Sequence, residues 1–81
     1  MSDDNIRDLI DYVTKSLVEF PDDVKIHEKD NGRSRMYEVS VHAEDRGRII
    51  GKNGQTIRAL RSLVAAAATI QGMGASVDVT D

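Results

Sequence analysis

The apolar residues at the start of the chain recur at helical spacing, three or four positions apart, and form a single stripe: Ile6, Leu9, Ile10, Val13 and Leu17. Ser2 and the two aspartates after it supply an N-cap and acidic residues for a first turn. Phe20 precedes Pro21, and a residue before proline is pushed out of the helical conformation. We therefore expect a helix over residues 3–20.

Two segments after Pro21 alternate between apolar and polar positions, which is the pattern of strands. Between them lies Asn31-Gly32, the dipeptide that most strongly indicates a tight hairpin turn. We expect an antiparallel hairpin over residues 24–42, with strands Val24–Lys29 and Ser34–His42.

Two helices and a final strand complete the pattern. Residues 43–71 read as a short helix that ends at Gly51, followed by a second helix that begins near Gly54, and residues 75–79 alternate again. The order is therefore α-β-β-α-α-β. A right-handed crossover through the two helices makes the last two strands parallel. The predicted fold is α+β, a three-stranded mixed sheet with helices on one face.

Composition limits the remaining possibilities. A chain of 81 residues is one small domain, so we assign residues 1–81 to a single unit. With no cysteine and two histidines, neither a disulfide nor a zinc site is expected, and we predict no metal and no cofactor. The longest apolar run, 63–68, is far shorter than the roughly 20 residues of a membrane helix. The acidic N-terminus does not resemble a signal peptide, so we expect a cytoplasmic protein without a membrane partner.

Charge is distributed unevenly along the chain. The formal net charge is −3, which at first argues against nucleic acid as a partner. Residues 1–45 carry 12 acidic and 6 basic side chains, whereas residues 46–81 carry 5 basic and 2 acidic ones. The five cations follow one another without an intervening acid: Arg46, Arg48, Lys52, Arg58 and Arg61. This asymmetry indicates either an anionic ligand on one face or simply a solvated basic helix face.

The most informative stretch joins the two predicted helices and runs from Gly47 to Ile57. Gly51 and Gly54 lie three positions apart, and a loop without Cβ atoms at both ends lets a foreign backbone come close. The helix that follows points free N–H groups and its positive dipole end at this loop, and Lys52 adds a cation. A sugar–phosphate backbone suits that environment. The structural alternative is an ordinary corner between two helices with glycine caps.

Other glycine motifs do not fit the spacing. A P-loop needs four residues between its first glycine and its Gly-Lys pair, whereas Gly47 and Gly51 have three between them. A dinucleotide fingerprint needs a G-x-G start, which is absent. We find no nucleophile–base pair and no evident pair of carboxylates, so we assign no catalytic residue and do not expect an enzyme.

The segment Ile49–Ile57 resembles the signature of KH domains, an aliphatic pair, then GxxG, then a further aliphatic residue. The α-β-β-α-α-β order is similar to the bacterial, type II KH arrangement. More narrowly, Tyr37–Val39, Glu44–Arg48 and Ile57–Arg61 resemble the small stand-alone bacterial KH proteins of the KhpA family. The resemblance covers nearly the whole chain and is strongest over residues 36–68.

The resemblance implies single-stranded RNA as the ligand and assigns site residues. The loop Gly51-Lys52-Asn53-Gly54 would clamp the backbone of about four nucleotides. Ile50 and Ile57 would line an apolar groove for the bases, and Arg48, Thr56 and Arg58 would flank it. The full set of implied RNA-binding residues is Gly47, Arg48, Ile50, Gly51, Lys52, Asn53, Gly54, Gln55, Thr56, Ile57 and Arg58. The short segment 71–74 before the last strand would add few base contacts.

The resemblance also implies partners and a cellular role. Such proteins are associated with homodimers, and with heterodimers that include a larger KH-containing protein linked to cell division and envelope growth. They would act as post-transcriptional regulators or as RNA chaperone-like factors, and single-stranded DNA is a further possible ligand. The alternative is a protein-interaction module in which RNA binding is secondary. Ala65, Ala66 and Thr69 offer a small-residue helix surface for it, although packing on the chain's own sheet explains them equally well.

Overall fold

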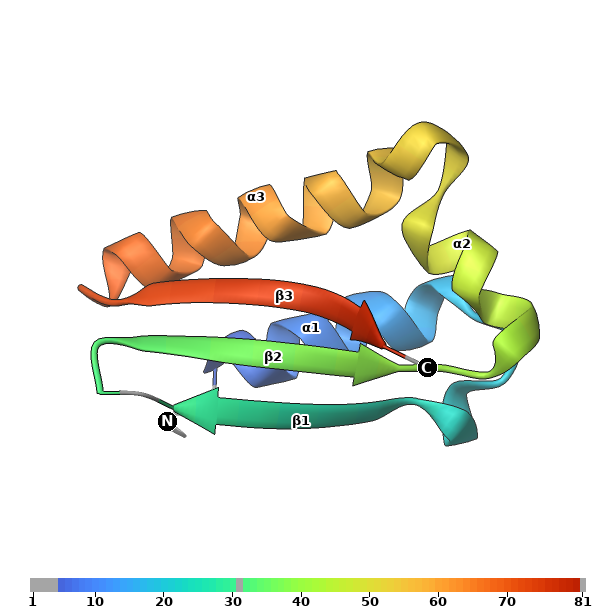
Figure 1. Ribbon diagram of the computed structural model, residues 1–81, viewed down its shortest axis with the longest axis horizontal. Helices are drawn as coiled ribbons and strands as arrows, with labels where there is room; N and C mark the ends of the chain where they lie inside the picture. The colour runs from blue at the N-terminus through green and yellow to red at the C-terminus, as the bar shows by residue number, and fades with distance from the viewer. Residues whose placement is uncertain (1–4, 31, 81) are drawn as a thin grey trace.

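The computed structural model describes residues 5–30 and 32–80, in which three helices and three strands follow the predicted α-β-β-α-α-β order (Figure 1). Short 3₁₀ turns lie between several of these elements. The helices and strands are α1 (Asn5–Leu17), β1 (Lys25–Asp30), β2 (Ser34–Ser40), α2 (Arg46–Ile50), α3 (Gln55–Ile70) and β3 (Gly74–Thr80).

The three strands form one mixed sheet in the order β1-β2-β3. β1 pairs antiparallel with β2, and β2 pairs parallel with β3, so that Tyr37 lies opposite Val77. α1 and α3 pack against one face of this sheet, and α2 connects it to α3 at the end where β2 finishes (Figure 1). The predicted α+β fold, a mixed sheet with helices on one face, is confirmed.

The core lies between the sheet and the two longer helices. Its buried apolar side chains come from the three helices, from β2 and β3, and from the residues just before β1 and just after β2: Ile6, Ile10, Val24, Tyr37, Val39, Val41, Ile49, Ile57, Leu60, Val64, Ala68 and Val77. The buried face of α1 continues through Thr14, four residues after Ile10, whereas Leu17 is exposed. The predicted stripe was therefore wrong at its end, because helical spacing alone does not show where a neighbouring surface stops.

Burial affects the protonation of one core residue. Tyr37 is fully buried on the central strand, and burial raises the pKa of its phenol above the ordinary value of 10.0, although the neighbouring Arg35 guanidinium acts in the opposite direction. Arg35 in turn has a raised pKa, because it interacts with Tyr37 and with the carboxylates of Glu28 and Asp30. The phenol is therefore held in its neutral form.

Several element boundaries differ from the prediction. α1 ends at Leu17 rather than at Phe20, and β2 ends at Ser40 because His42 leaves the sheet to cap the following 3₁₀ turn. The short helix predicted from residue 43 begins three residues later, as α2 at Arg46, because a 3₁₀ turn occupies Ala43–Asp45. The remaining described boundaries agree to within two residues. The predicted N-cap and Asn31 of the hairpin turn lie outside the described residues. No helix of residues 5–30 and 32–80 has the length and apolar character needed to cross a membrane.

Candidate nucleic-acid interface

The loop between α2 and α3 reverses the chain within four residues by using the left-handed backbone region. Gly51 has φ 76° and ψ 173°, Asn53 has φ 57° and ψ 26°, and Gly54 has φ 74° and ψ 16°. Glycine and asparagine tolerate positive φ far better than other residues do. Two backbone hydrogen bonds fix the turn, from Gly51 N–H to the carbonyl of Gly47 at 2.8 Å and from Gly54 N–H to that of Gly51 at 3.1 Å.

The two loop glycines have different surroundings. A Cβ built on Gly51 would lie 2.7 Å from Cβ of Thr56 and 2.8 Å from its backbone nitrogen, so Thr56 occupies that space. A Cβ on Gly54 would meet no atom within 4 Å, and the same is true of Gly47. Gly51 is therefore needed for packing within the loop, whereas the surface over Gly54 is open to an approaching ligand.

Positive charge is concentrated at this loop. Lys52 is exposed, and no side chain caps the N-terminus of the 16-residue helix α3 that begins after Gly54. Arg58 folds back over the loop, with Nη2 donating to the carbonyl of Asn53 at 2.8 Å and Nε to that of Gly54 at 3.3 Å. These bonds keep the carbonyls of Asn53 and Gly54 turned toward Arg58. The positive charge of Arg58 adds to that of the helix dipole beside the loop.

Arg48 lies apart from this group. Its Nη2 is 2.9 Å from a carboxylate oxygen of Glu19, and its Nε is 3.5 Å from Oδ1 of Asp45. Two acidic groups thus face the guanidinium that we expected beside the groove. A contact of Arg48 with RNA stays a prediction, and in the free protein this side chain joins α2 to the segment after α1.

The aliphatic residues of the motif also point in different directions. Ile49 and Ile57 are buried in the core, whereas Ile50 is exposed beside the loop. Ile57 therefore belongs to the core beneath the loop, whereas Ile50 leaves apolar surface exposed. Gln55 is exposed at the first position of α3, and Thr56, which follows it, is half-buried against Gly51.

A buried acid fastens the loop region to the rest of the fold, and the sequence did not reveal it. Asp45 is fully buried and accepts hydrogen bonds from the backbone N–H groups of Glu19 and Phe20, each at 3.0 Å. These bonds draw the chain out of α1 after Leu17. In the sequence, Asp45 stands beside a second acid, Glu44, at the start of the helix predicted from residue 43. Nothing in the sequence distinguishes the buried acid from its exposed neighbour.

His42 also has a structural task at this junction. Its ring stacks on Phe20, with ring centroids 4.1 Å apart, and its Nδ1 accepts a hydrogen bond from Glu44 N–H at 3.1 Å. Together with the hydrogen bonds of Asp45, this contact holds the start of α2 against the segment that follows α1.

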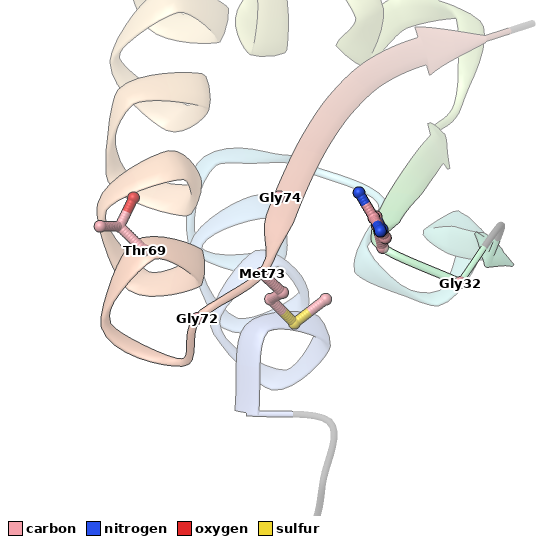
Figure 2. A pocket seen from close by; sticks show the side chains of 6 residues that line it. Gly32, Thr69, Gly72, Met73 and Gly74 are labelled. Atoms are coloured by element: carbon pink, nitrogen blue, oxygen red, sulfur yellow. The ribbon is translucent and has the colours of Figure 1, made fainter.

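A pocket of about 610 Å³ lies at the opposite end of the molecule, where the β1–β2 turn meets the connection from α3 to β3 (Figures 1 and 2). Figure 2 shows Met73 and Thr69 on its wall. The connection consists of residues 71–73, one residue shorter than the predicted segment 71–74, and Met73 N–H closes it by donating to the carbonyl of Ala68 at 2.9 Å. This pocket is separate from the Gly51–Gly54 loop.

The sequence matches a family model described as KhpA/KhpB, KH domain, over residues 7–79. A protein of Halalkalibacterium halodurans named RNA-binding protein KhpA is 45% identical over 76 residues, which cover 94% of this chain and all of that protein. Proteins with the same name from Streptomyces coelicolor and Leifsonia xyli are 41% and 46% identical, over 94% and 86% of this chain and 92% and 90% of their own lengths.

A similar fold occurs in a solved structure. A crystal structure of an Aquifex aeolicus Era variant bound to GDP and aluminium fluoride matches with a TM-score of 0.66 over 91% of this chain. The sequence identity is 16%, and this chain spans 29% of that one, so the similarity concerns the fold of one part of Era.

Proposed function

Because this chain belongs to the KhpA/KhpB family of KH domains, we propose that it binds single-stranded RNA and holds the RNA backbone on the loop Gly51-Lys52-Asn53-Gly54. The relatives named as RNA-binding proteins support this proposal. The observation that carries it is the loop itself, whose positive-φ turn leaves the surface over Gly54 open while Thr56 supports Gly51 from behind.

The chemistry of the loop suits a phosphate–sugar backbone. A phosphate above Gly54 would approach the uncapped N-terminus of α3, and the ammonium of Lys52 would lie at the loop tip. Such contacts carry no sequence information, so they position the RNA rather than specify it. Because the whole chain has a net charge of −3, the RNA footprint is confined to this basic end.

The remaining residues of the motif take secondary roles. Ile50 presents apolar surface to a base, and exposed Gln55 offers a polar contact at the start of α3. Gly47 leaves room beside them, since no atom lies within 4 Å of the position of its Cβ. We further propose that this binding serves post-transcriptional regulation or an RNA chaperone-like activity. No contact is assigned to a 2′-hydroxyl, and single-stranded DNA is therefore a second expected ligand.

The direct test compares two substitutions that change charge equally. Lys52→Asp places an acid on the loop, whereas Arg33→Asp places one beside the pocket at the opposite end of the molecule. Fluorescence anisotropy with a labelled eight-nucleotide RNA should show loss of binding for Lys52→Asp and near wild-type affinity for Arg33→Asp. If both variants weaken RNA binding equally, the loss follows from net charge rather than from the loop, and the proposal is contradicted.

A second proposal concerns the exposed side of α3. Four exposed apolar residues follow one another there at spacings of four, three and four, the pattern of a helix–helix seam: Ala59, Leu63, Ala66 and Ile70. The two large members, Leu63 and Ile70, are 47% and 87% exposed in the chain on its own. A row of exposed apolar side chains that includes one as exposed as Ile70 is typical of a protein–protein interface.

The seam is complementary to itself. If two copies of α3 pack antiparallel around a point between Val64 and Ala65, Leu63 of each copy lies opposite Ala66 of the other. In the same arrangement Ile70 lies opposite Ala59, so each large side chain meets a small one. A two-fold interface requires this kind of self-complementarity. We therefore propose a homodimer through α3, and a KH domain of a larger protein with a similar seam is the alternative partner.

A further inference from the structure

Arg61 reaches from α3 to the outer edge of the sheet. Its Nε donates to the carbonyl of Val77 at 3.0 Å, and its Nη2 lies 3.4 Å from Oδ1 of Asp78. The same carboxylate oxygen accepts a hydrogen bond from the backbone N–H of Val79 at 3.0 Å. Because β3 is the last strand in the sheet order, these outward-facing backbone groups have no neighbouring strand and are bonded by side chains instead.

An RNA held at the Gly51–Gly54 loop and running along α3 would pass this edge. Arg61 follows Gly54 by seven residues on the same helix, which is about 10 Å at 1.5 Å per residue. β3 runs beside α3, and its C-terminal end points toward the α2 end of the molecule (Figure 1). A strand of about four nucleotides held at the loop and running along α3 would therefore reach Arg61.

We propose that Arg61 reads a nucleobase, and that Asp78 and the Val77 carbonyl hold its guanidinium until RNA replaces them. This inference rests on the proposed RNA binding. A guanidinium is a fork of donors without an acceptor, so it matches a base edge that presents two neighbouring acceptors. Cytosine presents N3 and O2 in this way, and guanine presents O6 and N7. Uracil places an N–H donor between its two carbonyls and fits the fork poorly.

The resting contact is weak enough to be replaced. The side chains of Arg61 and Asp78 are 49% and 57% exposed, and exposed ion pairs contribute little to stability. The Asp78 carboxylate also repels an approaching phosphate. Asp78 is therefore a positioning residue that opposes RNA binding in two ways. It pairs with the guanidinium of Arg61, and its negative charge has the same sign as that of the RNA.

Matched variants separate these effects. Glu38 lies opposite Asp78 in the β2–β3 register and pairs with Lys29 at 3.0 Å, so Glu38→Gln removes a charge nearby without releasing Arg61. Arg7 donates to the carbonyl of Ile26 on β1 at 3.2 Å, so Arg7→Ala removes an equal charge from a helix-to-strand contact on the other edge strand. Binding of labelled eight-nucleotide oligocytidine and oligouridine is measured for each variant, and circular dichroism confirms folding.

We expect the wild type to prefer oligocytidine by about fivefold or more. Arg61→Ala should remove this preference, and so should Arg61→Lys, which keeps the charge but lacks the fork. Arg7→Ala should retain it. Asp78→Asn should strengthen oligocytidine binding by about two- to fivefold beyond Glu38→Gln, and this excess should disappear when Arg61 is also replaced by alanine.

The results that would overturn the inference are equally specific. Equal weakening of both oligonucleotides by Arg61→Ala would make Arg61 a phosphate contact. Self-association of Arg61→Ala with an unchanged base preference would make it a guard of the β3 edge. Equal effects of Asp78→Asn and Glu38→Gln would remove the role of Asp78. Each of these results leaves the proposed RNA binding intact if Lys52→Asp still abolishes binding, whereas a wild type that binds neither oligonucleotide overturns both proposals.

Discussion

The side chain of Thr56, in the first turn of α3, fills the space beside Gly51 at the end of α2. This contact joins the two helices on either side of the loop. A residue with a side chain at position 51 would have to adopt the positive φ of Gly51, and its Cβ would also clash with Thr56.

Gly51→Ala should therefore both destabilise the fold and weaken RNA binding. An L-residue at φ 76° costs about 1–2 kcal/mol in backbone strain, and the contact with Thr56 adds to this cost. Urea denaturation should show a loss of about 2 kcal/mol or more. Gly47→Ala is the control: Gly47 lies inside α2 with no atom within 4 Å of its Cβ position, so alanine there should keep or raise stability by up to about 1 kcal/mol. Equal losses in the two variants would contradict the role assigned to Thr56.

Asp45→Ala should be among the most destabilising single substitutions in the chain. It would leave the N–H groups of Glu19 and Phe20 without their acceptor in a place where Asp45 is fully buried. Hydrogen bonds to charged groups contribute about 1.5–3 kcal/mol each, so we expect a loss of about 3 kcal/mol or more by urea denaturation. Asp11→Ala, which removes an exposed i,i+4 pair with Lys15, should cost less than about 0.5 kcal/mol. A similar small cost for Asp45→Ala would refute the account of this junction.

Stability should fall at high pH because of Tyr37. Burial raises the pKa of its phenol, so above the ordinary value of 10.0 the unfolded chain loses this proton while the folded chain keeps it. The unfolded state then binds fewer protons, and the free energy of unfolding falls as pH rises past about 10, whereas below that pH the contribution is complete. Tyr37→Phe removes this titration. Urea denaturation between pH 8 and 11 should show a steeper decline for the wild type, and parallel curves would speak against it.

Ile70→Lys should separate two copies of the chain. Ile70 is 87% exposed and lies at one end of the α3 seam, opposite Ala59 in the proposed dimer. A lysine there would place two charges in an apolar contact and leave the monomer intact. Sedimentation equilibrium should give a dimer for the wild type and a monomer for the variant, with Ser16→Lys, exposed on α1 rather than on the seam, as the control. If the wild type remains a monomer at high concentration, the proposed homodimer is wrong and the seam would have to bind a different protein.

Local patterns predicted most of this fold, because spacing of apolar residues determines which face of a helix or strand is buried. The hairpin, the two helices around the loop and the last strand follow from that rule. The exceptions involve contacts between distant parts of the chain. α1 ends early because Asp45, 28 positions after Leu17, binds the backbone beyond it. Leu17 is exposed for the same reason, since the chain turns away from the core there.

The position of the loop between two helices could be predicted from the sequence, but the bonds of the side chains around it could not. The two glycines and Lys52 stand where the motif placed them. By contrast, Arg48 is paired with Glu19, and Arg58 is bonded to the loop carbonyls. Runs of basic residues show that charge gathers at one end of the molecule. They do not show which of these cations is already bonded to the protein itself.

Titration of the isotopically labelled protein with an eight-nucleotide single-stranded RNA, followed by amide NMR shifts, tests the central claim most directly. The account predicts that the largest shifts occur at Gly51, Lys52, Gly54 and Gln55, with little change at Gly72 and Gly74 beside the opposite pocket. Saturation with no shifts in the Gly51–Gly54 loop, or with the largest shifts around that pocket, would contradict it.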